Sequence, residues 1–183
     1  EQLPNIDAFK ISIFINITKF VDANGKLSRK APKGKWKIIR MGHTSTGHEN
    51  ATGGAGKGLE VDKFNPELIR FQLDHWFGEA IRTAGPELTS RVLEILHLDS
   101  WECGSQNWSS VFQAEFLKRR GYDIVDYLPV MAGIPIESVT TSEKVLYDVR
   151  KTISELVADN FYVTLADIAK KANVKFSSEN VAP

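Results

Sequence analysis

The chain has 183 residues, of which 42% are hydrophobic and 25% are charged, the composition of an ordinary globular protein. Lys plus Arg and Asp plus Glu both number 23, so the formal net charge is zero and charge gives no reason to expect nucleic acid or an anionic membrane as a partner. A single cysteine, Cys103, excludes a disulfide or a cysteine-based zinc site within the chain, and no apolar run is long enough to span a membrane.

An antiparallel β-hairpin segment is the first predicted element. Residues 11–17 (ISIFINI) and 35–41 (KWKIIRM) are β-branched and aromatic runs, which are typical of strands. Between them, Asn24-Gly25 is a strong hairpin signal. We therefore expect residues 1–41 to form a β-hairpin segment that precedes the main fold.

A glycine-rich loop, residues 42–58, follows this segment and contains His43 and His48. These histidines are either ligands or solvated side chains. The GAGKG stretch of the loop does not match a P-loop, because Ala51 stands where the first glycine is needed and Gly58 stands where Ser or Thr is needed.

The next signals predict a helix followed by a strand. Asn65-Pro66 provides a cap residue and a proline at the first helical position, apolar residues recur at helical spacing over 69–81, and Gly85-Pro86 predicts the end of the helix. The run RVLEILHLD is then apolar on both faces, as in a parallel strand covered by helices. Within that strand, His97 is interpreted as a hydrogen-bonded core residue.

Helical patterns and a final strand complete the chain. Ser110 and Gln113 predict the start of a helix that stops at Gly121, and its charged end, residues 118–120, is interpreted as a solvated last turn. A long helical pattern then runs to Ala169, with Asn160 as a candidate break, before the strand-like VKFSSEN. Strands that alternate with helices indicate an α/β fold with parallel strands.

Acidic residues follow both predicted parallel strands. Asp99 and Glu102 flank Trp101 after the first strand, and Glu179 follows the second. The carboxyl ends of parallel strands meet at one edge of a sheet, where functional side chains collect. A carboxyl beside an indole ring has its pKa raised by desolvation, which suits a general acid.

A second acidic pair and the tryptophans complete the candidate chemistry. Glu60 and Asp62 alternate, so both carboxylates face one side of an extended segment. Paired carboxylates with Trp101 and Trp108 as platforms for sugar rings are suited to glycosidic bond cleavage. The alternatives stay open: the acids are helix caps or salt-bridge partners, and the tryptophans belong to the core. Cys103 has no histidine nearby in the sequence that would support a cysteine nucleophile.

Four stretches in order resemble the catalytic region of α-L-rhamnosidases of glycoside hydrolase family 106: KGKWKIIRMGHTSTG, GKGLEVDKF, LHLDSWECGSQNWSSVFQAEFLKRRGYDIVDYLPVMAG and FSSENVAP. The resemblance implies a (β/α)₈ barrel inside a larger, secreted or periplasmic bacterial enzyme. That enzyme would remove α-linked L-rhamnose from plant polysaccharides with inversion, with calcium helping to hold the sugar. Because a barrel needs about 250 residues, we expect residues 42–183 to form a partial TIM-type barrel, and both chain ends suggest a piece of a longer protein.

The resemblance also assigns roles to individual residues. Glu102 matches the general acid of the family, and Glu179 matches a glutamate that contacts calcium or substrate. Glu179 lies in Ser-Glu-Asn, whereas the family usually has Ala-Glu-Ala. The general base is expected beyond Pro183. The residues expected to shape the acid or line the sugar pocket are Asp99, Trp101, His43, Glu60 and Asp62.

Two other functions fit the same sequence. One is a non-catalytic carbohydrate-binding or scaffold protein that keeps a barrel segment without the chemistry. The other is an open α/β sheet that binds a different small molecule. A partial barrel would leave strand edges and apolar helix faces uncovered, so self-association of the chain is also expected.

Overall fold

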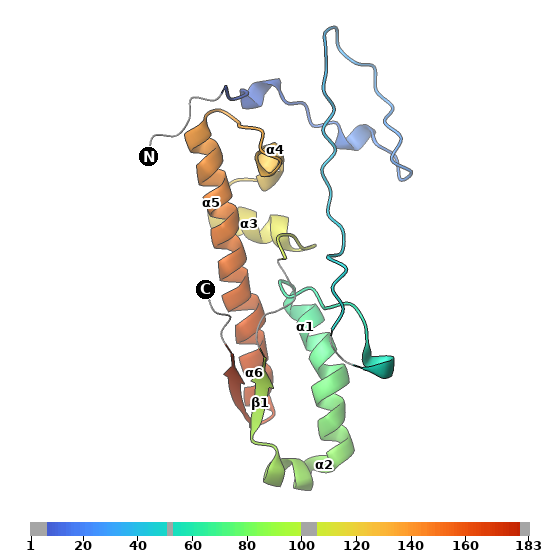
Figure 1. Cartoon of the computed structure of the whole chain (residues 1–183), viewed down its shortest axis with the longest axis vertical. Coiled ribbons are helices and arrows are strands. Elements are labelled where there is room, and N and C mark those ends of the chain that lie inside the picture. The colour runs from blue at the N-terminus through green and yellow to red at the C-terminus, as the bar shows by residue number, and fades with distance from the viewer. Residues whose placement is uncertain (1–6, 51–52, 100–105, 180–183) are drawn as a thin grey trace. The chain divides into compact units, whose positions relative to one another are not determined.

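The structure, a computed structural model, describes residues 7–50, 53–99 and 106–179 (Figure 1). The chain divides into two compact units. The first comprises Glu1–Gly42 and Asp123–Val149, and the second comprises His43–Tyr122 and Arg150–Pro183. Each unit is described separately below. The domain division predicted between residues 41 and 42 stays a prediction.

The predicted N-terminal hairpin is wrong. Residues Ile11–Ile13 (η1) and Thr18–Phe20 (η2) form short 3₁₀ helices, and residues 35–41 have no regular structure. The turn at Asn24-Gly25 does form, with Gly25 at φ 81° and a single antiparallel bridge between Val21 and Leu27, but no ladder extends from it.

The reason is the lack of a surface on which the two apolar runs could pack. Ile13 and Ile38 are 55% and 66% exposed, so the β-branched runs have strand propensity without burial. Strand propensity largely reflects packing of the pleated surface, and it is weak where nothing covers that surface. The local turn instead depends on Asp22, whose Oδ1 accepts hydrogen bonds from the amides of Asn24 and Lys26.

The rest of the first unit is built on a short loop that holds the N-terminal segment. The amide of Phe9 donates to the Pro135 carbonyl at 2.9 Å, and the amide of Glu137 donates back to Phe9 at 2.8 Å. Glu137 also accepts a hydrogen bond from the Ile11 amide and pairs with Lys10 at 3.1 Å. The helices of this unit are Ile124–Tyr127 (η5), Leu128–Met131 (α4) and the first part of Val139–Leu156 (α5).

From Pro66 the second unit forms a nearly continuous helical stretch. It runs through Pro66–Leu73 (α1), the π-helical turn Asp74–Gly78 (η4) and Glu79–Val92 (α2). The predicted start is confirmed, because the Asn65 side chain accepts from the Glu67 amide. At the predicted end, Gly85 adopts φ 77° and kinks the helix, which then continues for another seven residues to Val92.

Helix α3, Phe112–Arg120, ends at Gly121 as predicted, with the glycine in the left-handed region at φ 80°. A glycine is favoured there because it has no Cβ to clash with the preceding turn. At the other end of α3, the hydroxyl of Ser109 accepts from the Val111 amide at 3.2 Å. Ser109, which precedes the predicted cap Ser110, thus supplies this contact.

The long C-terminal helical pattern is also confirmed, with a local change of winding at the candidate break. Helix α5 leads into the π-helical turn Val157–Tyr162 (η6), which leads into Val163–Lys171 (α6). Asn160 lies in this π-helical turn. A further short helix, Gly54–Gly56 (η3), lies in the glycine-rich loop.

The sheet consists of two parallel strands, Ile95–Leu98 (β1) and Lys175–Ser178 (β2), paired from Ile95 with Lys175 to Leu98 with Ser178. The predicted partial (β/α)₈ barrel is therefore wrong: the described part of the chain is mainly helical and forms this sheet alone. Each strand has only four residues, and the sequence between them is helical over most of its length.

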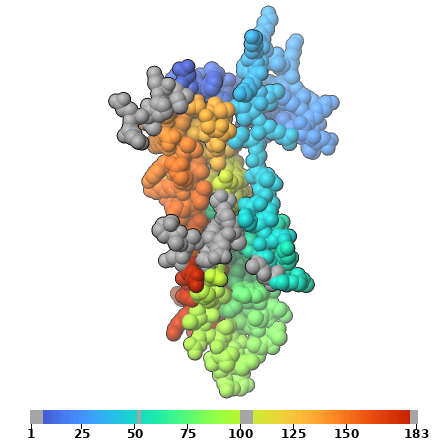
Figure 2. Space-filling model, viewed as in Figure 1, coloured from blue at the N-terminus to red at the C-terminus, as the bar shows by residue number. Residues whose placement is uncertain are grey.

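The core of the second unit lies between this sheet and the helices. One face of β1 is buried at Leu96, whereas Ile95 on the other face is 47% exposed, so the expectation of a strand buried on both faces is wrong. Figure 2 shows β1 in yellow-green beside β2 in red and α2 in green. The buried members of this core are Ile69, Leu73, Phe77, Leu96, Phe161, Leu165 and Ala169. Within the described ranges, no helix is long and apolar enough to cross a membrane.

Candidate functional site

The carboxyl ends of the two strands lie side by side. Leu98 pairs with Ser178, and the amide of Glu179 donates to the Leu98 carbonyl oxygen at 3.0 Å. Asp99 and Glu179 therefore follow paired residues at the same edge of the sheet, and both are exposed. The sequence correctly predicts that acids from two distant strands meet at this edge. Trp101, Glu102 and Cys103 lie outside the described residues.

His97 lies on the exposed side of β1. Its Nδ1 is 2.9 Å from the hydroxyl oxygen of Ser177 on β2, so the two side chains share a hydrogen bond across the sheet. The interpretation of His97 as a core histidine is wrong, since the apolar positions of β1 that face the helices are Leu96 and Leu98.

Asp62 lies at the centre of a hydrogen-bond network that joins two distant loops. Its Oδ1 accepts from Gln106 Nε2 at 2.6 Å and from the Phe64 amide at 3.0 Å. Its Oδ2 accepts from the Ser109 hydroxyl at 2.6 Å. Gln106 completes the network, because its Oε1 accepts from the Lys63 amide at 3.2 Å. We call Asp62, Gln106 and Ser109 the Asp62 clasp.

Gln106 and Ser109 did not appear among the residues predicted for the site. Their side chains contact Asp62 across 44 and 47 residues of sequence, a relationship that no local pattern reveals. The sequence feature that could have pointed to Gln106 and Ser109 is the polar run GSQNWSS. It comes soon after a predicted strand end, where functional side chains tend to collect.

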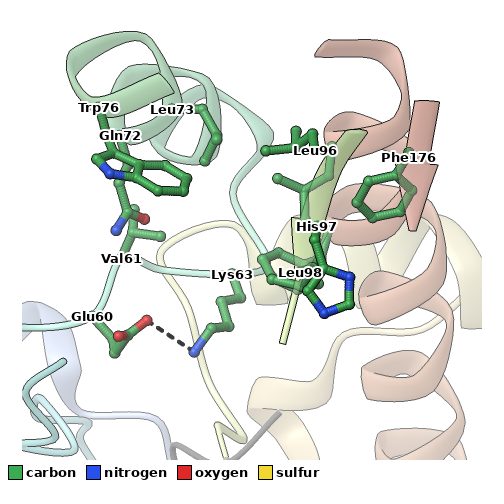
Figure 3. Close-up of a pocket in the computed structure, with 12 residues that line it drawn as sticks. Glu60, Val61, Lys63, Gln72, Leu73, Trp76, Leu96, His97, Leu98 and Phe176 are labelled. Atoms are coloured by element: carbon green, nitrogen blue, oxygen red, sulfur yellow. Dashed lines mark ion pairs between the residues drawn. The ribbon is translucent and has the colours of Figure 1, made fainter. Parts of the chain in front are cut away.

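Glu60 and Lys63 form an ion pair at the rim of a small pocket (Figure 3). The Glu60 carboxylate lies 3.2 Å from Lys63 Nζ, and both side chains are largely removed from solvent. Figure 3 shows Gln72 and Trp76 on one side of the pocket, and the β1 side chains with Phe176 of β2 on the other. The pocket has a volume of about 160 Å³ and mainly apolar walls.

The aromatic side chains of the second unit form a continuous stack. Trp108 is half-buried, and its ring centroid lies 4.9 Å from that of Phe112 and 6.4 Å from the imidazole of His43. Phe112 continues the stack to Phe64 and Phe116 at 6.3 and 6.1 Å. These contacts give Trp108 a packing role and place His43, which is exposed, beside it. Their predicted contacts with sugar stay predictions.

The charged end of α3 is not a solvated turn as predicted. Arg119 and Arg120 are mostly buried, and both donate to the carboxylate of Glu155 on α5. Arg119 also binds Asp159 at 2.7 Å. The hydrogen bond from Arg120 is the main reason that the pKa of Glu155 lies below its usual value. Of the three basic residues, Lys118 alone is strongly exposed.

Glu179, the predicted calcium ligand, is the last of the residues that the structure describes. Among the described residues, no group of three or more His, Cys, Asp or Glu side chains could hold an ion. Calcium prefers six to eight oxygen ligands. The calcium prediction stays a prediction, and no step below depends on a metal.

Comparison with known proteins places this chain among the glycoside hydrolases. A relative from Formosa agariphila, named "Putative beta-glucuronidase", is 39% identical over 166 residues, which cover 90% of this chain and 14% of the relative. The structure of a rhamnosidase from Novosphingobium sp. PP1Y superposes with a TM-score of 0.78 at 30% identity, over 93% of this chain and 17% of that one.

The family is shown by a third comparison. The signature of glycoside hydrolase family 106, described as alpha-L-rhamnosidase, matches residues 2–182. The chain belongs to this family, and the resemblance noted in the sequence is confirmed. The chain nevertheless spans only a small part of the length of the relative and of the solved rhamnosidase.

Proposed function

We propose that this chain is part of an enzyme that hydrolyses terminal α-L-rhamnosides of plant polysaccharides with inversion at the anomeric carbon. The observation that carries the proposal is the family match over residues 2–182, which spans both strands and the acids that follow them. The 30% identity to a rhamnosidase of solved structure supports the same sugar.

In this proposal, Glu102 is the general acid that protonates the departing glycosidic oxygen. Asp99 and Trp101 shape its surroundings, and His43 and Glu60 line the sugar pocket. The inverting mechanism needs a second carboxylate that activates water, about 6.5–9.5 Å from the acid. We expect that base beyond Pro183, so the chain alone should not turn over substrate.

Substitution of the acid in the full-length protein tests the proposal. Glu102→Gln should abolish cleavage of an aryl rhamnoside and leave the circular dichroism spectrum unchanged. Glu87→Gln is the control, because Glu87 lies on α2 with its side chain 89% exposed, and it should retain full activity. Near-wild-type turnover by Glu102→Gln would overturn the assignment. The non-catalytic carbohydrate-binding alternative predicts binding of rhamnosides without turnover in the wild-type protein.

Stereochemistry provides a second, independent test. Proton NMR of the first product formed by the full-length enzyme should show the anomer opposite to that of the substrate. Retention would instead require a nucleophilic carboxylate about 5–5.5 Å from the acid. A product that retains its configuration would therefore refute the inverting mechanism while leaving the glycosidase assignment intact.

A second candidate substrate is a β-glucuronide, favoured by the name of the Formosa agariphila relative. A glucuronide carries a carboxylate where rhamnose carries a methyl group, so its site needs a cation. The rates of cleavage of an aryl rhamnoside and an aryl glucuronide distinguish the two substrates. The correct sugar should be cleaved about 10⁴-fold faster, as is typical when buried polar groups select a substrate.

Three other expectations remain part of the proposal. Calcium bound near Glu179 would be tested by calorimetric titration of the full-length protein. Secretion or periplasmic location would be tested by fractionation of the native host. Self-association of the isolated chain is supported by exposed aromatic side chains such as Phe71 and Trp76, and monomeric sedimentation would contradict it.

A further inference from the structure

We propose that Asp62 is a positioning residue, which acts through Gln106 and Ser109 to anchor the loop 106–109, four residues after Glu102 in the sequence, and that it is not a sugar ligand. The inference rests on the proposed function, because it takes Glu102 as the general acid. It differs from the role that the sequence suggested for Asp62, which was contact with substrate.

The first argument is that the protein itself already occupies most of the acceptor positions of the Asp62 carboxylate. Three donors bind it: Gln106 Nε2 and the Ser109 hydroxyl, each at 2.6 Å, and the Phe64 amide at 3.0 Å. An ionised carboxylate accepts about four hydrogen bonds. A sugar hydroxyl would therefore find only about one acceptor position open on this half-buried carboxylate, because the protein already occupies three.

The second argument is that the clasp binds the loop 106–109 through backbone groups as well as through the side chains of Gln106 and Ser109. Gln106 Nε2 also donates to the Trp108 carbonyl oxygen at 3.1 Å, and its Oε1 accepts from the Lys63 amide at 3.2 Å. The Ser109 side chain is buried and bonds the Val111 amide at the start of α3. Gln106 is thus fixed in position and in orientation.

The third argument concerns where Gln106 lies in the chain. It comes four residues after Glu102 in the sequence. On the other side of Glu102, the chain is fixed by the pairing of Leu98 with Ser178 and by the Glu179 amide. The described residues on both sides of the acid are therefore anchored, one side by the sheet and the other by the clasp.

Both anchors lead to helix α1. The clasp joins α3 to the segment before α1, where Phe64 is fully buried, and the sheet packs on α1 and α6. A general acid must lie within hydrogen-bond reach of the leaving oxygen, and small displacements of catalytic groups cost large factors in rate. Loss of the clasp should therefore impair proton donation more than sugar binding.

The test measures kcat and KM of the full-length enzyme on two rhamnosides that differ only in their leaving group. A dinitrophenyl rhamnoside departs with little protonation, whereas an alkyl rhamnoside needs the acid. Asp62→Ala should lose at least about 10-fold more kcat/KM on the alkyl substrate, within the 10²–10⁴-fold that general acid catalysis contributes. An equal loss on both substrates, with a raised KM, would make Asp62 a sugar ligand and overturn the inference.

Two further variants distinguish loss of positioning from a general folding defect. Asp62→Asn keeps an acceptor oxygen for Gln106 and should recover part of the activity on the alkyl rhamnoside. Gln106→Ala leaves Asp62 in place and should reproduce the leaving-group dependence of Asp62→Ala.

Asn50→Ala is the control. The side chain of Asn50 makes two comparable loop hydrogen bonds, one to the Gly56 carbonyl oxygen and one from the Gly58 amide, and it does not contact the clasp. Equal leaving-group effects in Asn50→Ala and Gln106→Ala would overturn the inference.

Hydrogen exchange separates the clasp from the proposed function. Amide exchange at Lys63 and Phe64 should become faster in Gln106→Ala and stay unchanged in Asn50→Ala. Unchanged exchange in Gln106→Ala would overturn the anchoring. Absence of rhamnosidase turnover in the wild-type enzyme would overturn the proposed function and the catalytic part of this inference, while the exchange result would still decide whether the clasp anchors the loop.

Discussion

Asn160 donates a hydrogen bond from Nδ2 to the backbone carbonyl oxygen of Phe64 at 2.7 Å, across 96 residues of sequence. Phe64 is fully buried, and Asn160 lies in the π-helical turn between α5 and α6. Such turns are rare and frequently occur at functional sites. This one fixes the C-terminal helices to the loop that carries Glu60 and Asp62.

Removal of this hydrogen bond should destabilise the protein measurably. Asn160→Ala leaves the Phe64 carbonyl without this partner in a buried setting, which typically costs about 1–3 kcal/mol. Denaturant unfolding of the full-length protein would measure the change. Asn107→Ala removes an exposed amide and should alter the unfolding free energy by less than about 0.5 kcal/mol. Equal effects of the two variants would show that the hydrogen bond does not contribute to stability.

The parts of the fold that the sequence predicts correctly are those specified by neighbouring residues. The cap at Asn65 and the stop at Gly121 follow from local backbone chemistry, and both are present. Strand β2 also forms where VKFSSEN predicts it. Each of these features is specified by residues within one helical turn or one strand. They can therefore be predicted without knowing which distant residues they contact.

The hairpin and the barrel could not be predicted reliably because both depend on distant packing. Residues 11–17 and 35–41 have strand-like composition, yet Ile13 and Ile38 remain exposed and unpaired in a ladder. The same limit applies to the site. Glu60 and Asp62 share a predicted face, but their partners differ, since Glu60 pairs with Lys63 nearby and Asp62 binds Gln106 far along the chain.

Gly121 provides a test of backbone strain at the end of α3. Its φ of 80° is unfavourable for any residue with a Cβ, so Gly121→Ala should destabilise the protein by about 1–2 kcal/mol. Gly58→Ala is the matched control, because Gly58 has no strained φ and an added Cβ would meet no atom within 4 Å. Thermal unfolding of the two variants would check the difference, and a stable Gly121→Ala would contradict it.

The pH dependence of stability should include a contribution from Glu155. Its pKa lies below the ordinary value of 4.5, mainly because Arg120 donates a hydrogen bond to its carboxylate. A carboxyl with a depressed folded-state pKa stabilises the protein above its unfolded pKa, and this contribution is lost as the pH falls through the folded pKa.

Glu155→Gln should therefore lower the unfolding free energy at pH 7 and make its decline below about pH 4.5 shallower than in the wild type. Chemical unfolding of the full-length protein between pH 7 and pH 3 would measure both effects. A variant that loses the same free energy at every pH would show that Glu155 acts by packing and not through its charge.

Phe112 lies at the centre of the aromatic stack. It is fully buried, and it contacts Trp108, Phe64 and Phe116. Phe112→Ala should cost about 3–5 kcal/mol, because the cavity would lie among rings that cannot all move into it. Leu117 lies on the same helix but is 48% exposed, so Leu117→Ala should cost much less.

Spectroscopy links this stability change to the candidate site. Trp108 lies 4.9 Å from Phe112 between ring centroids, so removal of the phenyl ring should change the near-ultraviolet circular dichroism of the indole even under conditions where the variant stays folded. Leu117→Ala should leave that signal unchanged. If Phe112→Ala alters stability but not the indole signal, then Trp108 is held by other contacts, and its packing role would have to be assigned to those.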